Sequence, residues 1–259
     1  MKIDADKLDD CEMVRSRSYS DYFHLMVSKR VTAFFIRLGW IPEQVLFLWG
    51  VLSVLSSYFI YLAIAGHPLA IGVSFLLYYF ANVLDIVDGN LARYLDRSNP
   101  VAGKILDGIF HRLTEYSILI AFTYGTLEKT EQAFVIPLGF ALLLGEAMQT
   151  YCTERRLLVI RLHAKPNSVP VESKPWDVRT EGWTDFSLRE KAKALEGLLA
   201  YKTVYFMIAL SYISNELLIA GLILLTCYKH FSWLKLITKL CLNPPELKVT
   251  PTSVPANSR

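Results

Sequence analysis

The sequence lacks the cysteine pattern of a disulfide-rich or zinc-binding protein. It contains four cysteines, and they are widely separated along the chain: Cys11, Cys152, Cys227 and Cys241. No two of them have the short spacing that a metal site or a disulfide framework uses. We therefore expect reduced cysteines that act as small packing residues.

Charged residues are also few. Asp, Glu, Lys and Arg make up 20% of the 259 residues and leave a net charge of only +3, whereas 53% of the residues are hydrophobic and 13% are aromatic. An ordinary soluble domain of this length is less apolar, so the composition predicts a membrane protein. The small positive charge is dispersed between apolar runs, and we expect no nucleic-acid partner.

No secretory signal is apparent before the hydrophobic segments, because the first 20 residues are charged and polar. We expect the N-terminus to stay in the cytoplasm. Residues 21–40, "DYFHLMVSKRVTAFFIRLGW", then mix apolar and basic residues at helical spacing. This pattern is typical of a helix lying in the membrane interface, although an ordinary soluble amphipathic helix shares it.

Six later segments are candidates to cross a bilayer, since a span needs about 20 mainly apolar residues. They are residues 45–65, 68–94, 104–127, 133–158, 198–213 and 216–228. The last two are interrupted by Lys202 and by "SYISNE", and the final helix could continue through "KHFSWLKLITKL". The predicted fold is an all-α integral membrane protein with about six transmembrane helices, preceded by an interfacial amphipathic helix.

The basic residues predict how these helices are oriented. The connections "AGHP" and "SNE" contain no Lys or Arg and "YGTLEKTEQ" contains only Lys129, whereas the other basic residues lie at the opposite ends of the spans. By the positive-inside rule, both termini face the cytoplasm. We expect a cytoplasmic N-terminal segment (1–44), a six-helix membrane domain (45–240) and a disordered tail (241–259). Within the domain, a cytoplasmic loop (161–195) contains a short helix that Ser187 could cap.

The stretch "NVLDIVDGNLARYLDRSNPVAGKILDGIFHRLTEY", residues 82–116, places ionisable residues in an otherwise apolar setting. At 100° per residue, Asp85 and Asp88 fall on one face of the first helix, and Asp107 and His111 on one face of the next. The helical rise from Pro68 places these residues just inside the cytoplasmic boundary of the membrane, where water and nucleotides can reach them.

Three converging carboxylates repel one another unless a cation compensates their charge. Hard oxygen ligands favour Mg²⁺, with Mn²⁺ or Ca²⁺ as substitutes, and Mg²⁺ also takes phosphate oxygens. Small residues at Gly89, Ala92 and Gly103 would leave a trough for a diphosphate or a base. In the alternative interpretation, the glycines serve helix packing and the aspartates pair with nearby arginines: Arg93, Arg97 or Arg112.

"DIVDGNLAR" followed by "GKILDGIFH" resembles the signature of the CDP-alcohol phosphatidyltransferase family, DxxDGxxAR with a downstream GxxxDxxxD. The motif covers residues 85–111, and the predicted layout is similar to the family over most of the chain. The resemblance implies a cytoplasmic active site with two metal ions, Mg²⁺ or Mn²⁺, and a homodimer. It also implies transfer of a substituted phosphoryl group, such as phosphatidyl, from a CDP-linked donor to an alcohol, with release of CMP.

The resemblance assigns roles to individual residues. Metal binding falls to Asp85, Asp88 and Asp107, and the CDP site to Gly89, Ala92, Arg93 and Gly103, with Arg93 suited to the diphosphate. This chain departs from the family in two ways. Nine residues rather than the usual eight separate Arg93 from Gly103, and His111 stands where the family has a fourth aspartate that acts as the general base.

His111 leaves three interpretations open. A neutral imidazole can take a proton from an attacking hydroxyl and can also ligate a metal, which fits an active enzyme. Alternatively, the chain is an inactive homologue that binds a nucleotide, a lipid or a protein partner. In the third interpretation His111 only packs, and Asp96, in the turn after Arg93, supplies the base.

The substrates also remain open. If the donor is CDP-diacylglycerol, the acceptor is a small alcohol or alcohol phosphate, and arginines at cytoplasmic helix ends could bind its phosphate: Arg112, Arg155, Arg156 and Arg161. The same arginines could be an ordinary positive-inside flank. If the donor is a soluble CDP-alcohol, the acceptor is a membrane lipid. A transporter is disfavoured because the cluster lies near one face rather than at the midplane.

Overall fold

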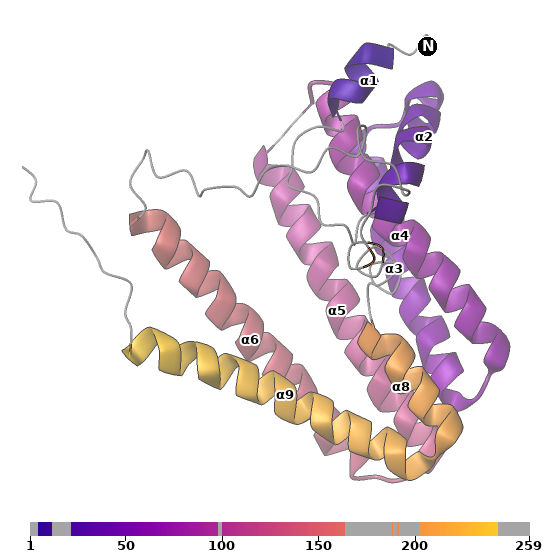
Figure 1. The fold of residues 1–259 in the computed structure, drawn as a ribbon, viewed down its shortest axis with the longest axis vertical. Helices are drawn as coiled ribbons and strands as arrows, with labels where there is room; N and C mark the ends of the chain where they lie inside the picture. Colours follow the sequence, from indigo (N-terminus) through magenta and orange to yellow (C-terminus); the bar gives the residue numbers. More distant parts are fainter. Residues whose placement is uncertain are drawn as a thin grey trace, which may run out of the picture.

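The computed structural model describes residues 5–11, 22–97, 100–163 and 202–242, together with Leu188 and Lys191. Within this part of the chain, the regular elements are all helices (Figure 1). They are α1 (Ala5–Cys11), α2 (Tyr22–Leu38), α3 (Pro42–Ala65), α4 (Pro68–Tyr94), α5 (Pro100–Thr130), α6 (Val135–His163), α8 (Lys202–Ile213) and α9 (Asn215–Leu242). The all-α fold predicted from the sequence is confirmed.

Six of these helices occupy the segments predicted to span the membrane: α3, α4, α5, α6, α8 and α9. By length and composition, four helices are able to cross a membrane, over Pro42–Ala65, Pro68–Tyr94, Val135–Arg155 and Asn215–Lys239. α5 has charged side chains towards both of its ends, and α8 contributes a shorter apolar helix, Thr203–Ile213. The protein is an integral membrane protein, while the count of six spans and the cytoplasmic side of the termini stay predictions.

The local sequence explains where the apolar helices begin and end. Pro42 and Pro68 are the first residues of α3 and α4, positions at which a backbone N–H is not needed. Gly66 ends α3 with a φ of 113°, a left-handed conformation that favours glycine. The Ser214 Oγ accepts a hydrogen bond from the Leu217 N–H at 3.1 Å and so caps α9. The "SYISNE" interruption is thus a boundary between two helices, and α9 continues unbroken through "KHFSWLKLITKL".

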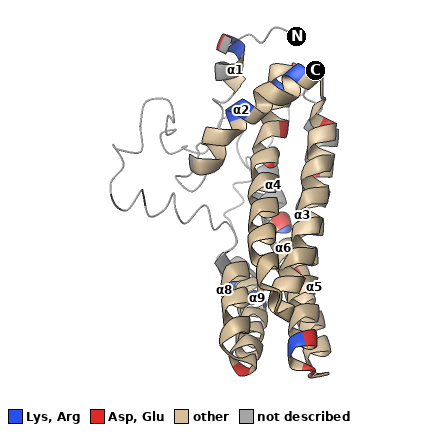
Figure 2. Cartoon of the chain, turned by 90° about the vertical axis from the view of Figure 1, so that its right-hand side faces the viewer, with Lys and Arg blue, Asp and Glu red and all other residues tan. Residues whose placement is uncertain are grey.

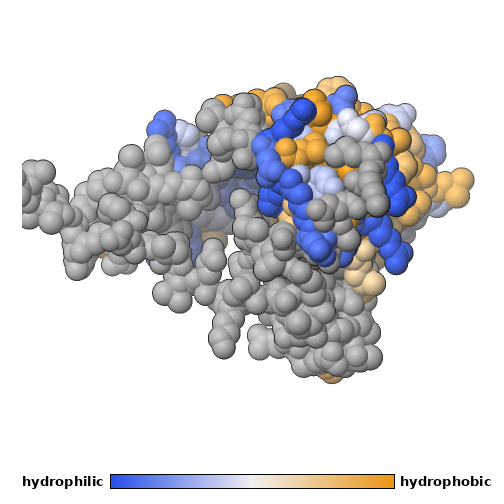
Figure 3. Space-filling view, turned by 90° about the horizontal axis from the view of Figure 1, so that it is seen from above, coloured by the Kyte–Doolittle hydropathy of each residue, from blue (hydrophilic) through white to orange (hydrophobic). Residues whose placement is uncertain are grey.

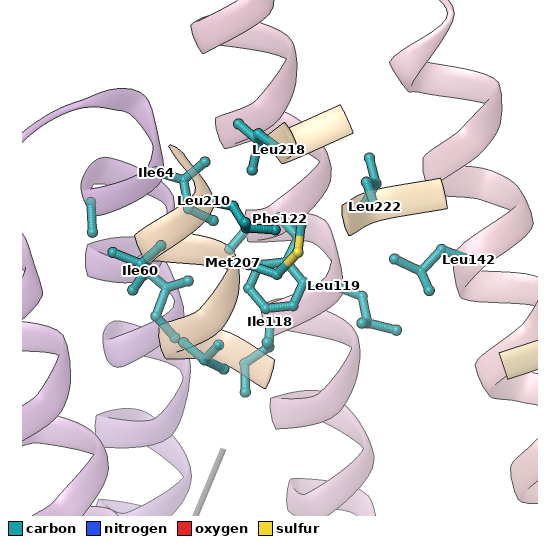
Figure 4. Close-up of a cluster of buried hydrophobic side chains, with 14 of the residues drawn as sticks. Ile60, Ile64, Ile118, Leu119, Phe122, Leu142, Met207, Leu210, Leu218 and Leu222 are labelled. Carbon is teal, nitrogen blue, oxygen red and sulfur yellow. The ribbon is translucent and has the colours of Figure 1, made fainter. Parts of the chain in front are cut away.

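The helices pack around α3. α4 and α5 both lie against α3, while α6 packs along α9 (Figure 1). One buried apolar cluster joins α3, α4, α5, α6, α8 and α9 in the half of the molecule away from α1, with Ile60, Phe122 and Met207 among its side chains (Figure 4). A second cluster joins α1, α2, α3 and α4 at the α1 end. The end of the molecule next to α1 therefore has a buried apolar core of its own.

α2 has a buried side and an exposed side, and each mixes apolar and polar residues. The buried residues include Leu25, Phe35 and Ile36 but also His24, Ser28 and Thr32, and the exposed residues include Arg30 and Arg37 but also Met26, Phe34 and Leu38. The middle parts of α3, α4 and α5 carry few charged side chains (Figure 2). Seen from the α1 end, hydrophilic residues gather on the described part of this surface, with hydrophobic residues between them and along its upper and right-hand edges (Figure 3). This distribution agrees with an apolar helix bundle that has a polar end next to α1. The position of α2 in the membrane interface stays a prediction.

Some predicted features fall outside the described residues. These are most of the 161–195 loop, with the Ser187 cap, and the tail after Leu242. The backbone of Gly103 lies in α5, but its surroundings are outside the described part of the chain. The segment boundaries 1–44, 45–240 and 241–259 are therefore not tested.

Candidate metal centre

The predicted site residues lie where α4 ends and α5 begins, at the α1 end of the molecule (Figure 1). α4 and α5 both pack against α3, and this shared support brings their inner faces together. The chain leaves α4 through a left-handed cap: Asp96 has a φ of 52°, and the Arg97 N–H donates to the Ala92 carbonyl at 3.0 Å. This cap ends α4 shortly after the acidic motif.

Asp85 of α4 and Asp107 and His111 of α5 form one cluster. The His111 Nε2 lies 3.2 Å from an Asp107 carboxylate oxygen and 3.5 Å from an Asp85 carboxylate oxygen. One ligand atom of each side chain lies within 4.8 Å of the other two. The side chains are 33%, 44% and 47% exposed for Asp85, Asp107 and His111, so an ion or a substrate can reach the cluster.

The donor chemistry of this cluster fits a divalent cation. Two carboxylates and one imidazole suit Mn²⁺, and the oxygen ligands suit Mg²⁺. Asp88, one helical turn after Asp85, interacts electrostatically with Asp85 and Asp107 and stands beside the three-residue group. Two carboxylates beside the imidazole, with a third close by on α4, leave an excess of negative charge that a cation would compensate.

Arg93 lies over the glycine of the motif. A Cβ added at Gly89 would meet the Arg93 guanidinium at 3.5 Å. The Arg93 Nε–H donates to the Cys11 carbonyl at 2.7 Å, and one of its Nη2–H groups donates to the Asn90 Oδ1 at 2.6 Å. Ala92 is partly buried on the same helix. A Cβ 3.5 Å from the guanidinium would make an ordinary van der Waals contact, so Arg93 does not itself require a glycine at position 89. The predicted contact of Gly89 and Ala92 with a nucleotide stays a prediction.

Arg112 has acidic partners of its own. Its guanidinium lies 2.6 Å from the Glu115 carboxylate and 3.1 Å from that of Glu154. Arg155 lies over the Tyr151 ring, 5.2 Å from the ring centroid. These contacts favour an ordinary flank over a phosphate pocket for both arginines. The side chains of Arg156 and Arg161 fall outside the described part of the chain.

Asp96, the alternative base, has a different position. Its side chain is 79% exposed, and its carboxylate accepts a hydrogen bond from the Lys7 Nζ at 2.7 Å. It does not belong to the group formed by Asp85, Asp107 and His111. Of the two candidate bases, His111 thus lies in the cluster and Asp96 does not, and the identity of the base stays a prediction.

Sequence analysis missed three residues that support the cluster. The Trp49 ring packs edge-on against His111, with 4.8 Å between ring centroids, and is itself only 3% exposed. A Cβ at Gly50 would lie 2.2 Å from the Phe110 ring, so glycine is what allows α5 to approach α3 here. Asn90 binds Arg93. A tryptophan followed by a glycine in an apolar segment could pack against many partners. The sequence alone therefore does not show that this pair contacts α5.

Comparison with known proteins gives two findings. Residues 40–237 match the family model described as CDP-alcohol phosphatidyltransferase, and this range includes the whole cluster. A curated relative from Thermococcus kodakarensis, named bifunctional IPC transferase and DIPP synthase, is 34% identical over 117 residues, which are 44% of this chain and 24% of the relative. The match thus spans about a quarter of that relative's length.

Proposed function

Because this chain belongs to the CDP-alcohol phosphatidyltransferase family, we propose that it transfers a phosphatidyl group from a CDP-linked donor to an alcohol and releases CMP. CDP-alcohol phosphotransfer, the less specific form of this proposal, is supported by the family match over residues 40–237 and by the relative from Thermococcus kodakarensis. The proposal for this site is carried by the convergence of Asp85, Asp107 and His111, whose ligand atoms lie within 4.8 Å of one another although the residues come from two helices.

The acidic residues are the proposed metal ligands. Asp85, Asp107 and His111 would hold one divalent cation, and Asp88 would help to hold a second. Bound Mg²⁺ or Mn²⁺ would supply positive charge to the diphosphate oxygens of the donor. Arg93 adds a fixed positive charge beside the motif, which would stabilise the negative charge that develops on those oxygens.

His111 is the proposed general base. One ring nitrogen cannot bind the metal and take a proton at the same time, so His111 acts as base only when it is not a ligand. In that role Nε2–H would donate to the Asp107 carboxylate, 3.2 Å away, Nδ1 would take the proton of the acceptor hydroxyl, and the carboxylate would stabilise the resulting imidazolium. Asp85 adds a second negative charge at 3.5 Å. The edge-on contact with Trp49 restricts the orientation of the imidazole ring. Because histidine brings less negative charge than aspartate, we expect weaker binding of the second ion.

The substrates and the assembly are inferred from the family and from the place of the site in the membrane. A CDP-diacylglycerol donor with a small alcohol or alcohol-phosphate acceptor fits a cluster near one end of an apolar bundle. A soluble CDP-alcohol with a lipid acceptor fits the same position. A homodimer with its active sites on the cytoplasmic face completes the proposal.

The test is CMP release by purified protein in detergent with Mg²⁺ or Mn²⁺. One panel offers CDP-diacylglycerol with alcohols and alcohol phosphates, and a second offers CDP-alcohols with lipid acceptors. Asp107→Ala and His111→Ala should lose metal-dependent turnover, whereas Glu43→Ala, which removes an exposed carboxylate from the start of α3, should keep it.

The panel also decides between the active enzyme and the inactive homologue. Turnover in only one panel identifies which substrate carries the lipid. A folded protein that binds CDP but releases no CMP with any pair of substrates would contradict the proposal and favour the inactive homologue.

A further inference from the structure

The N-terminal helix α1 is docked on the end of α4. Two of its residues, Leu8 and Cys11, are 6% and 5% exposed and belong to the buried cluster shared with α2, α3 and α4. At its surface, the Lys7 ammonium lies 2.7 Å from the Asp96 carboxylate and 5.5 Å from the centroid of the Tyr94 ring. A buried apolar face and an ion pair thus hold a short helix against the end of the motif.

Arg93 joins this helix to the metal centre. Two of its hydrogen bonds go to different elements, one to the carbonyl of Cys11, 82 positions earlier in the chain, and one to Asn90 on α4. Asn90 has 0% exposure, so the packing around it restricts the amide whose Oδ1 accepts from Arg93. A guanidinium is planar, and two acceptors at two of its nitrogens fix its plane as well as its position.

The position that is fixed in this way lies beside the acidic motif. The guanidinium covers Gly89 and interacts electrostatically with Asp88. Asp96, the partner of Lys7, lies in the cap that ends α4 immediately after Arg93. A change at Lys7 or Leu8 can therefore displace the Cys11 carbonyl without altering any residue of the metal cluster.

We propose that α1 and Asn90 are positioning elements for Arg93, holding its guanidinium ready for the diphosphate of a CDP-containing ligand. Lys7 and Leu8 dock α1, the Cys11 carbonyl orients the Nε side of Arg93, and Asn90 orients its Nη2 side. The inference rests on the proposed function, because it assigns Arg93 to the diphosphate. A preorganised guanidinium loses less freedom when the ligand binds, so undocking α1 weakens binding more than it slows the reaction.

The first arm of the test measures the docking of α1 by an assay that does not depend on enzymatic turnover. Cys11 is kept as the only cysteine by the changes Cys152→Ala, Cys227→Ala and Cys241→Ala, and its alkylation by a maleimide is timed in detergent. A second chain lacks all four cysteines and carries Gln132→Cys, at an exposed position in the connection between α5 and α6, as the reference for rapid labelling. We expect slow labelling of Cys11, about threefold faster labelling after Lys7→Ala, which removes an exposed ion pair, about tenfold faster labelling after Leu8→Ala, and slow labelling again in Lys7→Arg.

The second arm measures the affinity for CDP with Mg²⁺ and, where turnover is found, KM and kcat for the donor. Lys7→Ala should weaken CDP binding and raise the KM of the donor about threefold, and Asn90→Ala about tenfold, with kcat within a factor of about two in both. Lys7→Arg should restore both values. Lys29→Ala on α2 is the matched control and should behave like the unaltered chain.

Rapid labelling of Cys11 in the unaltered chain would overturn the inference, and so would unchanged CDP affinity in both Lys7→Ala and Asn90→Ala. Loss of kcat with unchanged affinity would also overturn it, since that pattern assigns these residues to the chemical step. Absence of CMP release from a chain that passes the labelling and CDP arms would instead count against the proposed transfer reaction, so the two failures are distinguishable.

Discussion

Two polar clusters lie among the apolar helices, and they differ in charge balance and in burial. In the metal centre, Asp85 and Asp107 face one imidazole with side chains that are 33% and 44% exposed. Between α6 and α9, Glu146 is 6% exposed and pairs with Lys229. The first cluster has surplus negative charge that a ligand can reach, whereas the second is a neutral pair of a buried carboxylate and a partly buried ammonium.

The surroundings of the second cluster strengthen this contrast. His230 donates from Nε2 to the Ala141 carbonyl at 2.9 Å and accepts at Nδ1 from the Trp233 indole at 3.3 Å. A Cβ at Gly145 would lie 3.1 Å from Lys229, so this glycine lets α9 approach α6 closely. Groups that satisfy one another in this way join two helices. The comparison teaches that unbalanced and accessible charge, more than charge within an apolar helix, indicates the functional site.

The largest expected effect is on catalysis at the unbalanced cluster. Asp107→Asn keeps the shape of the side chain but removes a charge beside the His111 Nε2. We expect CMP release to fall about a thousandfold, with the unfolding temperature unchanged or raised, because one repulsion is relieved. Initial rates of CMP release check the first expectation, and thermal unfolding in detergent checks the second. If Asp107→Asn lost stability as well as activity, the metal centre would also have a structural role and would no longer differ in this respect from the Glu146–Lys229 pair.

The opposite pattern is expected at the balanced pair. Glu146→Gln leaves the partly buried Lys229 ammonium without its carboxylate and should cost about 3 kcal/mol of unfolding free energy. The turnover of the protein that remains folded should stay near that of the unaltered chain. Denaturant unfolding measures the unfolding free energy, and an active-site titration gives the turnover per folded molecule.

The matched control for that prediction replaces both partners. In Glu146→Met with Lys229→Met, no charge is left unpaired, and stability should return to within about 1 kcal/mol of the starting value. A double variant as unstable as Glu146→Gln would show that the helix contact depends on the ion pair itself.

Metal removal should lower the unfolding free energy through the metal centre alone, and by less than the loss expected for Glu146→Gln. With Mg²⁺ at about a hundred times its Kd, the bound ion stabilises the folded chain by about 2.7 kcal/mol, and a chelator removes this gain. The unaltered chain and Glu146→Gln should both show the shift in unfolding temperature, whereas Asp107→Asn should not. An equal shift in all three would place the ion elsewhere.

The smallest effect is expected at the exposed ion pairs of Arg112. Arg112→Ala removes its contacts with Glu115 and Glu154, and surface pairs contribute less than about 1 kcal/mol each. We expect the KM of a phosphate-bearing acceptor to change less than about twofold. A tenfold increase for that acceptor, but not for one without phosphate, would assign Arg112 to a phosphate pocket.

The sequence predicted those parts of the site that depend on spacing along one helix. Asp107 and His111 are four residues apart, and the structure brings them to 3.2 Å as helical geometry requires. The approach of Asp85 to His111 needs a second helix, and the motif resemblance indicated it. "SYISNE" was less informative, because its role as a helix boundary depends on the Ser214 hydroxyl accepting a particular backbone N–H.

By itself, then, the sequence determined the all-helical fold, the membrane setting, the family and the identity of the clustered residues, because each follows from local periodicity, composition or a continuous motif. Only the tertiary structure decided that Trp49 braces His111, that Asp96 pairs with Lys7 and that Arg93 is held by a carbonyl of α1. Those contacts join residues from separate helices, and backbone carbonyls carry no side-chain signature. They depend on how the helices pack, which spacing within any one helix does not specify.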